Sequence, residues 1–282
     1  MQKLTDTFEL NNKVKIPCIG FGTWQTPDGQ TAINAVKEAL NAGYRHIDTA
    51  AAYKNEMSVG RAIAESGIAR KDIFITSKLW NTNRGYEKTL LAFNETIEKL
   101  GIDYLDLYLI HWPANKLQFE NWDEINLETW RAMTELYHNG KIRAIGVSNF
   151  LPHHLESLIK TEVVPAINQI EFHPGLMQSE TVRFCRNHGI VVEAWSPLGT
   201  GRMLNNETLI AIAASYGVSV AKLCIRWCLQ NNVLPLPKSV TPSRIRENID
   251  VFNFNISDAD MMIINAMSNF GGSGNDPDTV TF

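Results

Sequence analysis

Four residues in the first part of the chain have side chains that together could protonate a carbonyl oxygen. Asp48 ends a short apolar run, Tyr53 lies in the loop after it, and Lys78 and His111 end the next two such runs. A tyrosine hydroxyl, with an ordinary pKa of about 10, is a proton donor at neutral pH, and a nearby ammonium lowers that pKa. Asp48 can balance the charge of a buried Lys78, and His111 can orient the oxygen or help to relay a proton. Such a group suits a reaction in which a hydride reaches the carbonyl carbon.

Each of these residues also has a simpler structural interpretation. A strand-end aspartate such as Asp48 is often a helix N-cap, Tyr53 could pack with its hydroxyl in water, and Lys78 could be a surface charge. A lone histidine such as His111 is more often a hydrogen-bonded core residue than a catalyst. The chemical interpretation is favoured if the fold brings the four side chains to one place.

Eight short apolar runs alternate with helical patterns along the chain, and this alternation predicts an eight-stranded parallel (β/α)₈ barrel of the TIM type, in the α/β class. The runs are "PCIGFGT", "RHIDTA", "IFITSKLW", "YLDLYLIHW", "IRAIGVSN", "AINQIEFH", "IVVEAWSP" and "VLPLPKS". Several helical patterns end at a glycine, as at Gly43, Gly101, Gly140 and Gly189, which suits a left-handed position after a helix. Polar residues follow the runs, and the active face of such a barrel lies at the carboxyl ends of its strands.

Both ends of the chain carry additional segments. The stretch 8–17, "FELNNKVKIP", predicts a hairpin across the barrel floor. Residues 257–269 predict an extra capped helix, and 270–282 a loop rich in Gly, Asp and Pro. No linker interrupts the pattern, so we expect one domain over 1–282. A doubly wound sheet is the structural alternative, but "GFGTWQ" after the first run lacks the third glycine of a dinucleotide-binding turn.

Composition excludes several functional classes. The net charge is −4 and no Lys/Arg block occurs, which argues against a nucleic-acid partner. No apolar stretch reaches the roughly 18 residues of a membrane span, and the polar start "MQKLTDTFELNNKVK" lacks a signal-peptide core. We therefore expect a cytoplasmic protein without membrane association. The four cysteines form no C-x-x-C pair and read as reduced core thiols.

Three segments, in this order and separation, resemble the aldo-keto reductase family: "GYRHIDTAAAYKNE", "LYHNGKIRAIGVSNF" and "LPKSVTPSRIREN". The resemblance covers essentially the whole chain and is greatest to short bacterial-type members, similar to diketo-gluconate and glyoxal reductases. It implies a (β/α)₈ barrel that uses NADPH without a Rossmann domain. It also implies a catalytic tetrad of Asp48, Tyr53, Lys78 and His111, in which the tyrosine is the general acid and the histidine positions the carbonyl.

The second half of the chain predicts a cofactor track. Thr241 and Pro242 suit the N-cap and first turn of a helix, whose free N–H groups and dipole favour an anion. Lys238 and Arg244 add positive charge, so a 2′-phosphate and hence NADPH is preferred over NADH. Trp195 offers a flat face for stacking, where many relatives have tyrosine or phenylalanine. Together with what the resemblance implies, the expected cofactor-binding residues are Gly22, Thr23, Trp24, Asp48, Ser148, Asn149, Gln169, Trp195, Ser196, Pro197, Leu198, Lys238, Ser239, Val240, Arg244 and Asn248.

Aromatic residues near the strand ends predict the substrate side. Trp24, Trp80 and Trp112 suit the walls of a pocket for an apolar or flat carbonyl compound, with Tyr53 and His111 completing it. The loop 113–124 and the tail are expected to set specificity. The resemblance favours small aldehydes and ketones, including dicarbonyls, and a monomer. It leaves the physiological carbonyl substrate, the strictness for NADPH and the stereochemistry open.

Three other functions account for parts of the pattern. Glu171 and Glu193, from the sixth and seventh runs, could form the carboxylate pair of a glycosidase, but that leaves Lys78, Tyr53 and Lys238 unexplained. An NADP(H)-binding redox sensor of the same fold could keep the whole tetrad. A metal enzyme is disfavoured, because no H-E-x-x-H occurs and the pair 153–154, two histidines, falls in a predicted helix-start loop; no metal is expected.

Overall fold

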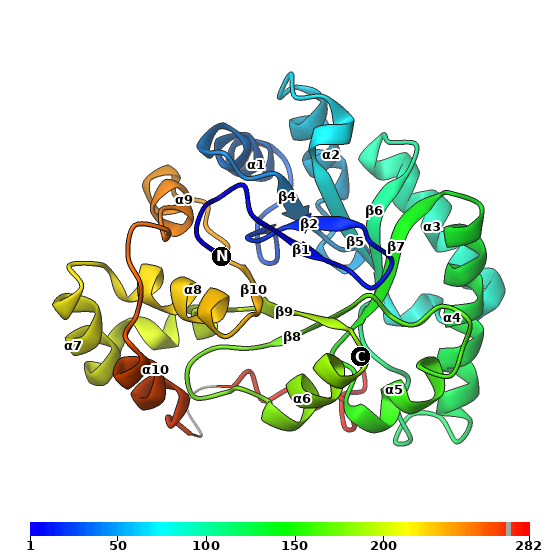
Figure 1. Ribbon diagram of the computed structural model, residues 1–282. Helices are drawn as coiled ribbons and strands as arrows, with labels where there is room; N and C mark the ends of the chain where they lie inside the picture. The colour runs from blue at the N-terminus through cyan, green and yellow to red at the C-terminus, as the bar shows by residue number, and fades with distance from the viewer. Residues whose placement is uncertain (269–271) are drawn as a thin grey trace.

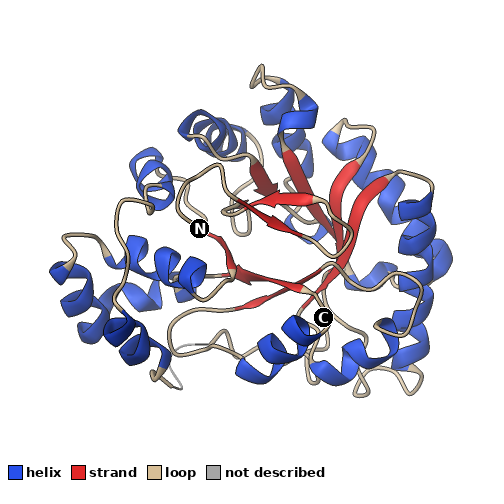
Figure 2. Cartoon of the chain, viewed as in Figure 1, coloured by secondary structure: helices blue, strands red, loops and turns tan. Residues whose placement is uncertain are grey.

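The computed structural model describes residues 1–268 and 272–282. Eight parallel strands form one sheet in which each strand pairs with the next one along the chain (Figure 2). They are β3 (Phe21–Gly22), β4 (His46–Asp48), β5 (Phe74–Leu79), β6 (Leu105–Ile110), β7 (Ile142–Ser148), β8 (Ile167–Glu171), β9 (Val191–Trp195) and β10 (Leu234–Leu236). The predicted barrel is confirmed.

The first and last strands of the sheet meet, and this closes the barrel. The N–H of Gly20 donates to the carbonyl oxygen of Pro235 at 3.1 Å, and the N–H of Gly22 donates to that of Pro237 at 3.0 Å. A side chain at position 20 would not fit there, because its Cβ would lie 2.5 Å from the ring of His46 and from Leu236. Glycine is therefore required where the two strands approach.

Helices surround the sheet (Figure 1). They are α1 (Gln30–Ala42), α2 (Glu56–Ala64), α3 (Tyr86–Leu100), α4 (Trp122–His138), α5 (Pro152–Leu158), α6 (Ser179–Asn187), α7 (Glu207–Ser215), α8 (Val220–Gln230), α9 (Pro242–Ile249) and α10 (Asp258–Asn265), with 3₁₀ turns η1 (Ala51–Tyr53), η2 (Arg70–Asp72), η3 (Asn81–Asn83) and η4 (Gly199–Asn205). Gly43 and Gly101 follow α1 and α3 in left-handed conformations, as the sequence predicts. The buried face of α8 includes Cys224 and Cys228, and all four cysteines are free and buried.

The N-terminal hairpin is formed by β1 (Thr7–Glu9) and β2 (Lys15–Pro17). Between these strands, Asn11 donates to the carbonyl oxygens of Val164 and Pro165, which precede β8, and Asn12 donates to that of Arg143 in β7. The hairpin therefore covers the amino ends of the strands, where Figure 1 shows it crossing the sheet. Functional groups are left to the opposite, carboxyl end.

The predicted extra helix is present as α10, and Ser257 caps it by accepting from the N–H of Asp260. The last residue of that prediction, 269, and the first two of the predicted tail, 270 and 271, lie outside the described residues. Among the residues described, no single helix has the length and apolar character to cross a bilayer. Helices α7 and α8 have that length and character only when taken together, and this pair is bent by 84°.

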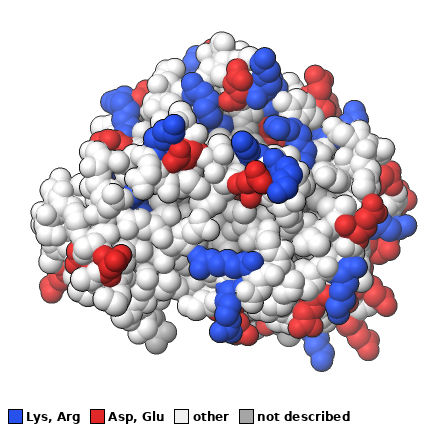
Figure 3. Space-filling view, in the orientation of Figure 1, with Lys and Arg blue, Asp and Glu red and all other residues white. Residues whose placement is uncertain are grey.

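Basic and acidic side chains are interspersed on the face shown in Figure 3, rather than separated into large patches of one sign. This distribution agrees with the small net charge of −4 and the lack of a Lys/Arg block in the sequence.

Candidate active site

A cavity of about 1250 Å³ opens at the carboxyl ends of the strands. Its wall includes most of the residues predicted from the sequence: Gly22, Trp24, Asp48, Tyr53, Trp80, His111, Trp112, Ser148, Asn149, Gln169, Trp195, Ser196, Pro197, Leu198, Lys238, Ser239, Arg244 and Asn248. Three predicted residues are not part of this wall. Lys78 lies buried beneath it, Thr23 is buried and donates its hydroxyl to the carbonyl oxygen of Asp48 at 2.9 Å, and Val240 is exposed.

Lys78 and Asp48 form a buried ion pair under the cavity. The ammonium of Lys78, on β5, lies 2.6 and 2.8 Å from the two carboxylate oxygens of Asp48 at the end of β4. It also donates to the carbonyl oxygen of Thr49 at 3.0 Å and to the hydroxyl of Tyr53 at 3.4 Å. Burial alone lowers the pKa of Lys78, but the charge of Asp48 and the contact with Tyr53 outweigh it and raise the pKa above its usual value. The lysine is therefore charged and held in place.

Tyr53 lies in η1, directly after the strand that ends at Asp48. The Lys78 ammonium lies 5.0 Å from the centre of its ring as well as beside its hydroxyl. The Lys78 ammonium lowers the pKa of Tyr53, as expected, but burial has the larger effect on that pKa and acts in the opposite direction. Loss of solvent raises the pKa of Tyr53 by more than Lys78 lowers it, and the resulting pKa is about 12. Tyr53 is consequently protonated at neutral pH, the form that a proton donor needs.

His111 follows β6 and faces both Tyr53 and Trp80. The ring centres are 5.6 Å apart for His111 and Tyr53 and 5.3 Å for His111 and Trp80. Burial, together with the charge of Lys78, holds the pKa of His111 well below its usual value. A neutral imidazole keeps one N–H for donation to an oxygen.

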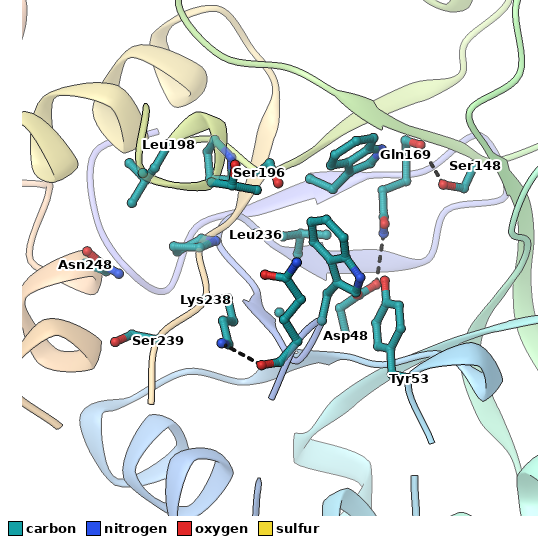
Figure 4. A pocket seen from close by; sticks show the side chains of 18 of the residues that line it. Asp48, Tyr53, Ser148, Gln169, Ser196, Leu198, Leu236, Lys238, Ser239 and Asn248 are labelled. Carbon is teal, nitrogen blue, oxygen red and sulfur yellow. Dashed lines mark hydrogen bonds between the residues drawn. The ribbon is translucent and has the colours of Figure 1, made fainter. Parts of the chain in front are cut away.

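An amide-rich region lies beside this group, as Figure 4 shows for Gln169, Ser148 and Asp48. The side-chain nitrogen of Gln169 donates to Asp48 at 2.9 Å and to Glu193 at 3.0 Å. Asn149, in a left-handed conformation with φ 63°, donates to the carbonyl oxygen of His111. The indole of Trp195 donates to the side-chain oxygen of Asn149 at 2.8 Å. Tryptophan at 195 thus adds a bond that phenylalanine could not make.

The other end of the cavity carries Lys238, Ser239 and Asn248, opposite the tyrosine in Figure 4. Lys238 donates to the carbonyl oxygen of Gln25 at 3.0 Å. Helix α9 begins there as predicted, with Thr241 at the N-cap and Pro242 in the first turn. Within residues 1–268 and 272–282, Arg244 has no ion-pair partner, whereas Arg246 on the same helix pairs with Glu38.

The tail completes the substrate side with Phe282, which sequence reasoning did not single out. Its ring stacks on Trp80 with centres 5.9 Å apart and meets the edge of Trp112 at 5.3 Å. Asn81 donates to its carbonyl oxygen at 2.9 Å, and Asn115 holds the tail by donating to Pro277 and Val280. An aromatic residue at the end of a polar tail was the available signal in the sequence.

The glycosidase pair does not face the cavity. Glu193 is fully buried beneath Gln169, and Glu171 accepts from the backbone and hydroxyl of Ser273. Neither carboxylate belongs to the cavity wall, so the pair has no access to a substrate there.

The two histidines at 153–154 lie in the first turn of α5, not in a loop. Their Nε2 atoms lie 2.8 and 3.1 Å from the same carboxylate oxygen of Asp278. His154 accepts from the N–H of Leu151 through Nδ1, so its Nε2 carries the hydrogen and donates to Asp278. The two histidines therefore link α5 to the tail through Asp278.

A parallel (β/α)₈ barrel with a buried ion pair, a tyrosine and a neutral histidine at its strand ends defines a barrel enzyme equipped for proton transfer. The model of the Aldo/keto reductase family matches residues 18–269. The chain is 50% identical to the glyoxal reductase of Bacillus subtilis, with 99% of both chains covered. The chain belongs to the aldo/keto reductase family and is an oxidoreductase.

Solved structures agree with this assignment. Gox0644, in a mutant form in complex with NADPH, is 41% identical, with a TM-score of 0.91 and 99% of both chains covered. The aldo-keto reductase of Bombyx mori in complex with NADP is 35% identical, with a TM-score of 0.85, over 95% of this chain and 94% of that one.

Proposed function

We propose that this protein reduces aldehydes and ketones to alcohols with NADPH, with Tyr53 as the general acid, and that its substrates are small carbonyl or dicarbonyl compounds. The observation that carries the proposal is the hydroxyl of Tyr53 3.4 Å from the ammonium of Lys78, which Asp48 holds in turn. The activity named for the Bacillus relative and the NADPH and NADP complexes of the structural neighbours support an NADP-dependent oxidoreductase.

The residues of the cavity fit the cofactor. Gln169, Asn149 and Ser148 supply amide and hydroxyl groups for the carboxamide, and Trp195 supplies a ring face. At the far end, Lys238 and Arg244 have no carboxylate partner among the described residues, so their charges suit the 2′-phosphate. When bound, the dihydronicotinamide supplies the hydride to the carbonyl carbon.

The chain's own residues deliver the proton. Tyr53 donates its hydroxyl hydrogen to the carbonyl oxygen, which becomes more basic than a phenolate as it gains negative charge. The charge that then develops on Tyr53 is stabilised by the ammonium of Lys78, already placed beside it. His111, neutral and adjacent, orients the oxygen by donating its N–H.

Aromatic rings shape the substrate side. Phe282 packs on both Trp80 and Trp112 next to His111, and these rings limit the access of water to the reacting groups. These walls suit a flat or apolar carbonyl compound. The same proposal takes 1–282 as one domain that acts as a monomer in the cytoplasm.

A reductase assay tests the proposal. NADPH oxidation would be followed by absorbance with methylglyoxal, 4-nitrobenzaldehyde and glyceraldehyde, with NADH in parallel. We expect substrate-dependent oxidation that is faster with NADPH at subsaturating cofactor. Tight NADPH binding without turnover on any aldehyde would instead favour the redox-sensor function.

A further inference from the structure

Glu193 is a buried acid that the proposed chemistry does not use. It lies on β9 with its side chain 0% exposed, and it is not part of the cavity wall. A carboxyl group in a barrel interior loses its hydration and needs protein partners in exchange. The partner that it has is Gln169, at 3.0 Å, on the neighbouring strand β8.

The amide of Gln169 is held in one orientation by two acids. Its nitrogen carries two hydrogens, and these are donated to Asp48 and to Glu193. The opposite orientation would place the amide oxygen against both carboxyl groups. The oxygen Oε1 accepts no hydrogen bond from the described residues, and Gln169 lines the cavity. It is therefore the free acceptor that the residue presents to a ligand.

We propose that Glu193 is a positioning residue for the cofactor: it holds the second hydrogen of the Gln169 amide and so turns Oε1 toward the N–H of the nicotinamide carboxamide. This inference rests on the proposed function, because it assumes that the carboxamide binds beside Gln169. It assigns Glu193 no contact with the cofactor itself.

The surroundings of Glu193 allow this role in its neutral form. His46 and Asp48 face it from β4, Lys78 from β5 and Gln169 from β8; the Nε2 of His46 lies 3.9 Å from its Oε1. Burial raises the pKa of Glu193 to about 8, and the charge of Asp48 acts in the same direction. The oxygen that faces Gln169 accepts a hydrogen bond whether or not the other oxygen is protonated. A glutamine can therefore replace Glu193, whereas a leucine cannot.

Cofactor discrimination tests the inference without turnover. Kd would be measured by quenching of tryptophan fluorescence, since Trp24 and Trp195 line the cavity. The ligands are NADPH and its 3-acetylpyridine analogue, whose acetyl group has no N–H. One hydrogen bond is worth about 0.5–1.5 kcal/mol, so the parent should prefer NADPH by about twofold to tenfold.

Three variants separate positioning from folding. Glu193→Gln should keep the parent's preference. Glu193→Asp, whose carboxyl is withdrawn from Gln169, and Glu193→Leu should both reduce the preference, because only the bond to Asp48 then holds the amide and Oε1 is less firmly directed. Melting temperatures measured by circular dichroism identify any variant that is not folded. If Glu193→Leu does not fold, the result for Glu193→Asp decides the test.

The outcomes are distinct. A parent-like preference in the folded Asp and Leu variants would overturn the inference and leave Glu193 a structural role, even if both melt at lower temperature. A parent protein that binds neither reduced cofactor would instead overturn the proposed function. Loss of the preference in the Asp variant with retention in Glu193→Gln would support the positioning role.

Discussion

The two ends of the cavity are built differently. At the reaction end, Asp48, Lys78 and Gln169 are buried, and Asp48 accepts hydrogen bonds from both of the others. At the far end, Arg244 is exposed, and among the described residues Lys238 bonds only to a backbone oxygen. Preorganised charges avoid rearrangement during a reaction, whereas surface charges can find their partner in the ligand. This difference agrees with the proposed function, in which the reaction end lowers the activation barrier and the far end contributes affinity for the cofactor.

The largest expected effect separates rate from affinity. Tyr53→Phe removes the proton donor and should lower kcat for reduction by about 10²- to 10⁴-fold, while the Kd for NADPH changes less than about twofold, because Lys78, Asp48 and Gln169 keep their bonds. Tyr137→Phe, on α4 and outside the cavity wall, is the matched control. If the Tyr53→Phe variant retained about a third of the activity, another group would have to donate the proton.

The buried pair should also support the stability of the reaction end. Removing one partner of a buried ion pair costs about 3–5 kcal/mol, so Asp48→Ala should lower the free energy of unfolding by that amount in urea. Asp250→Ala, which breaks a pair with Lys222 at a side chain 64% exposed, should cost less than about 1 kcal/mol.

A double substitution sharpens this test. Asp48→Leu combined with Lys78→Met removes both charges and should recover much of the lost stability without restoring activity. If Asp48→Ala costs no more than Asp250→Ala, the ion pair does not hold the reaction end together.

The far end should show the reverse behaviour, an effect on affinity that depends on the cofactor. Lys238→Ala and Arg244→Ala each remove a cation, and charged hydrogen bonds are worth about 1.5–3 kcal/mol. The Kd for NADPH should rise by about tenfold to a hundredfold, with that for NADH nearly unchanged. Arg246→Ala, already paired with Glu38, is the control and should alter neither. Equal weakening of both cofactors would mean that the phosphate binds elsewhere.

The smallest expected effect concerns pH. Tyr53 acts as a donor while protonated, and its pKa is about 12; His111 is already neutral because its pKa is far below the usual value. The pH profile of kcat/KM for reduction should therefore show no transition from either group between about pH 6 and 9. An acid transition near the ordinary histidine pKa of about 6.5 would assign a cationic role to His111. An alkaline transition near pH 8 that disappears in Glu193→Gln would belong to Glu193, whose pKa is about 8.

The sequence predicts the barrel and the tetrad because both depend on local patterns. Strand–helix alternation places Asp48, Lys78 and His111 at successive strand ends, and parallel strands end on one side. Contacts that depend on three-dimensional packing are not accessible in this way. The net pKa shift of Tyr53 depends on how far solvent is removed, and the role of Phe282 depends on the tail folding back onto Asn81.

Register explains two further differences. The register between neighbouring strands decides which of their side chains meet inside the barrel. The sequence of a single strand does not specify that register. Thr23 therefore bonds to Asp48 beneath the wall rather than facing the cavity, and Glu193 meets Gln169 rather than a substrate.

The closure of the barrel has a consequence for the order in which the protein is made. The seam joins segments at opposite ends of the chain: Lys238 bonds to Gln25, 213 positions away, next to the backbone bonds that link Gly22 to Pro237. A ribosome releases the catalytic residues first and the closing strand near the end of synthesis. Under the proposed function, a nascent chain therefore exposes Tyr53 long before Lys238 is made, and the proposed cofactor site is complete only when the polypeptide is almost finished.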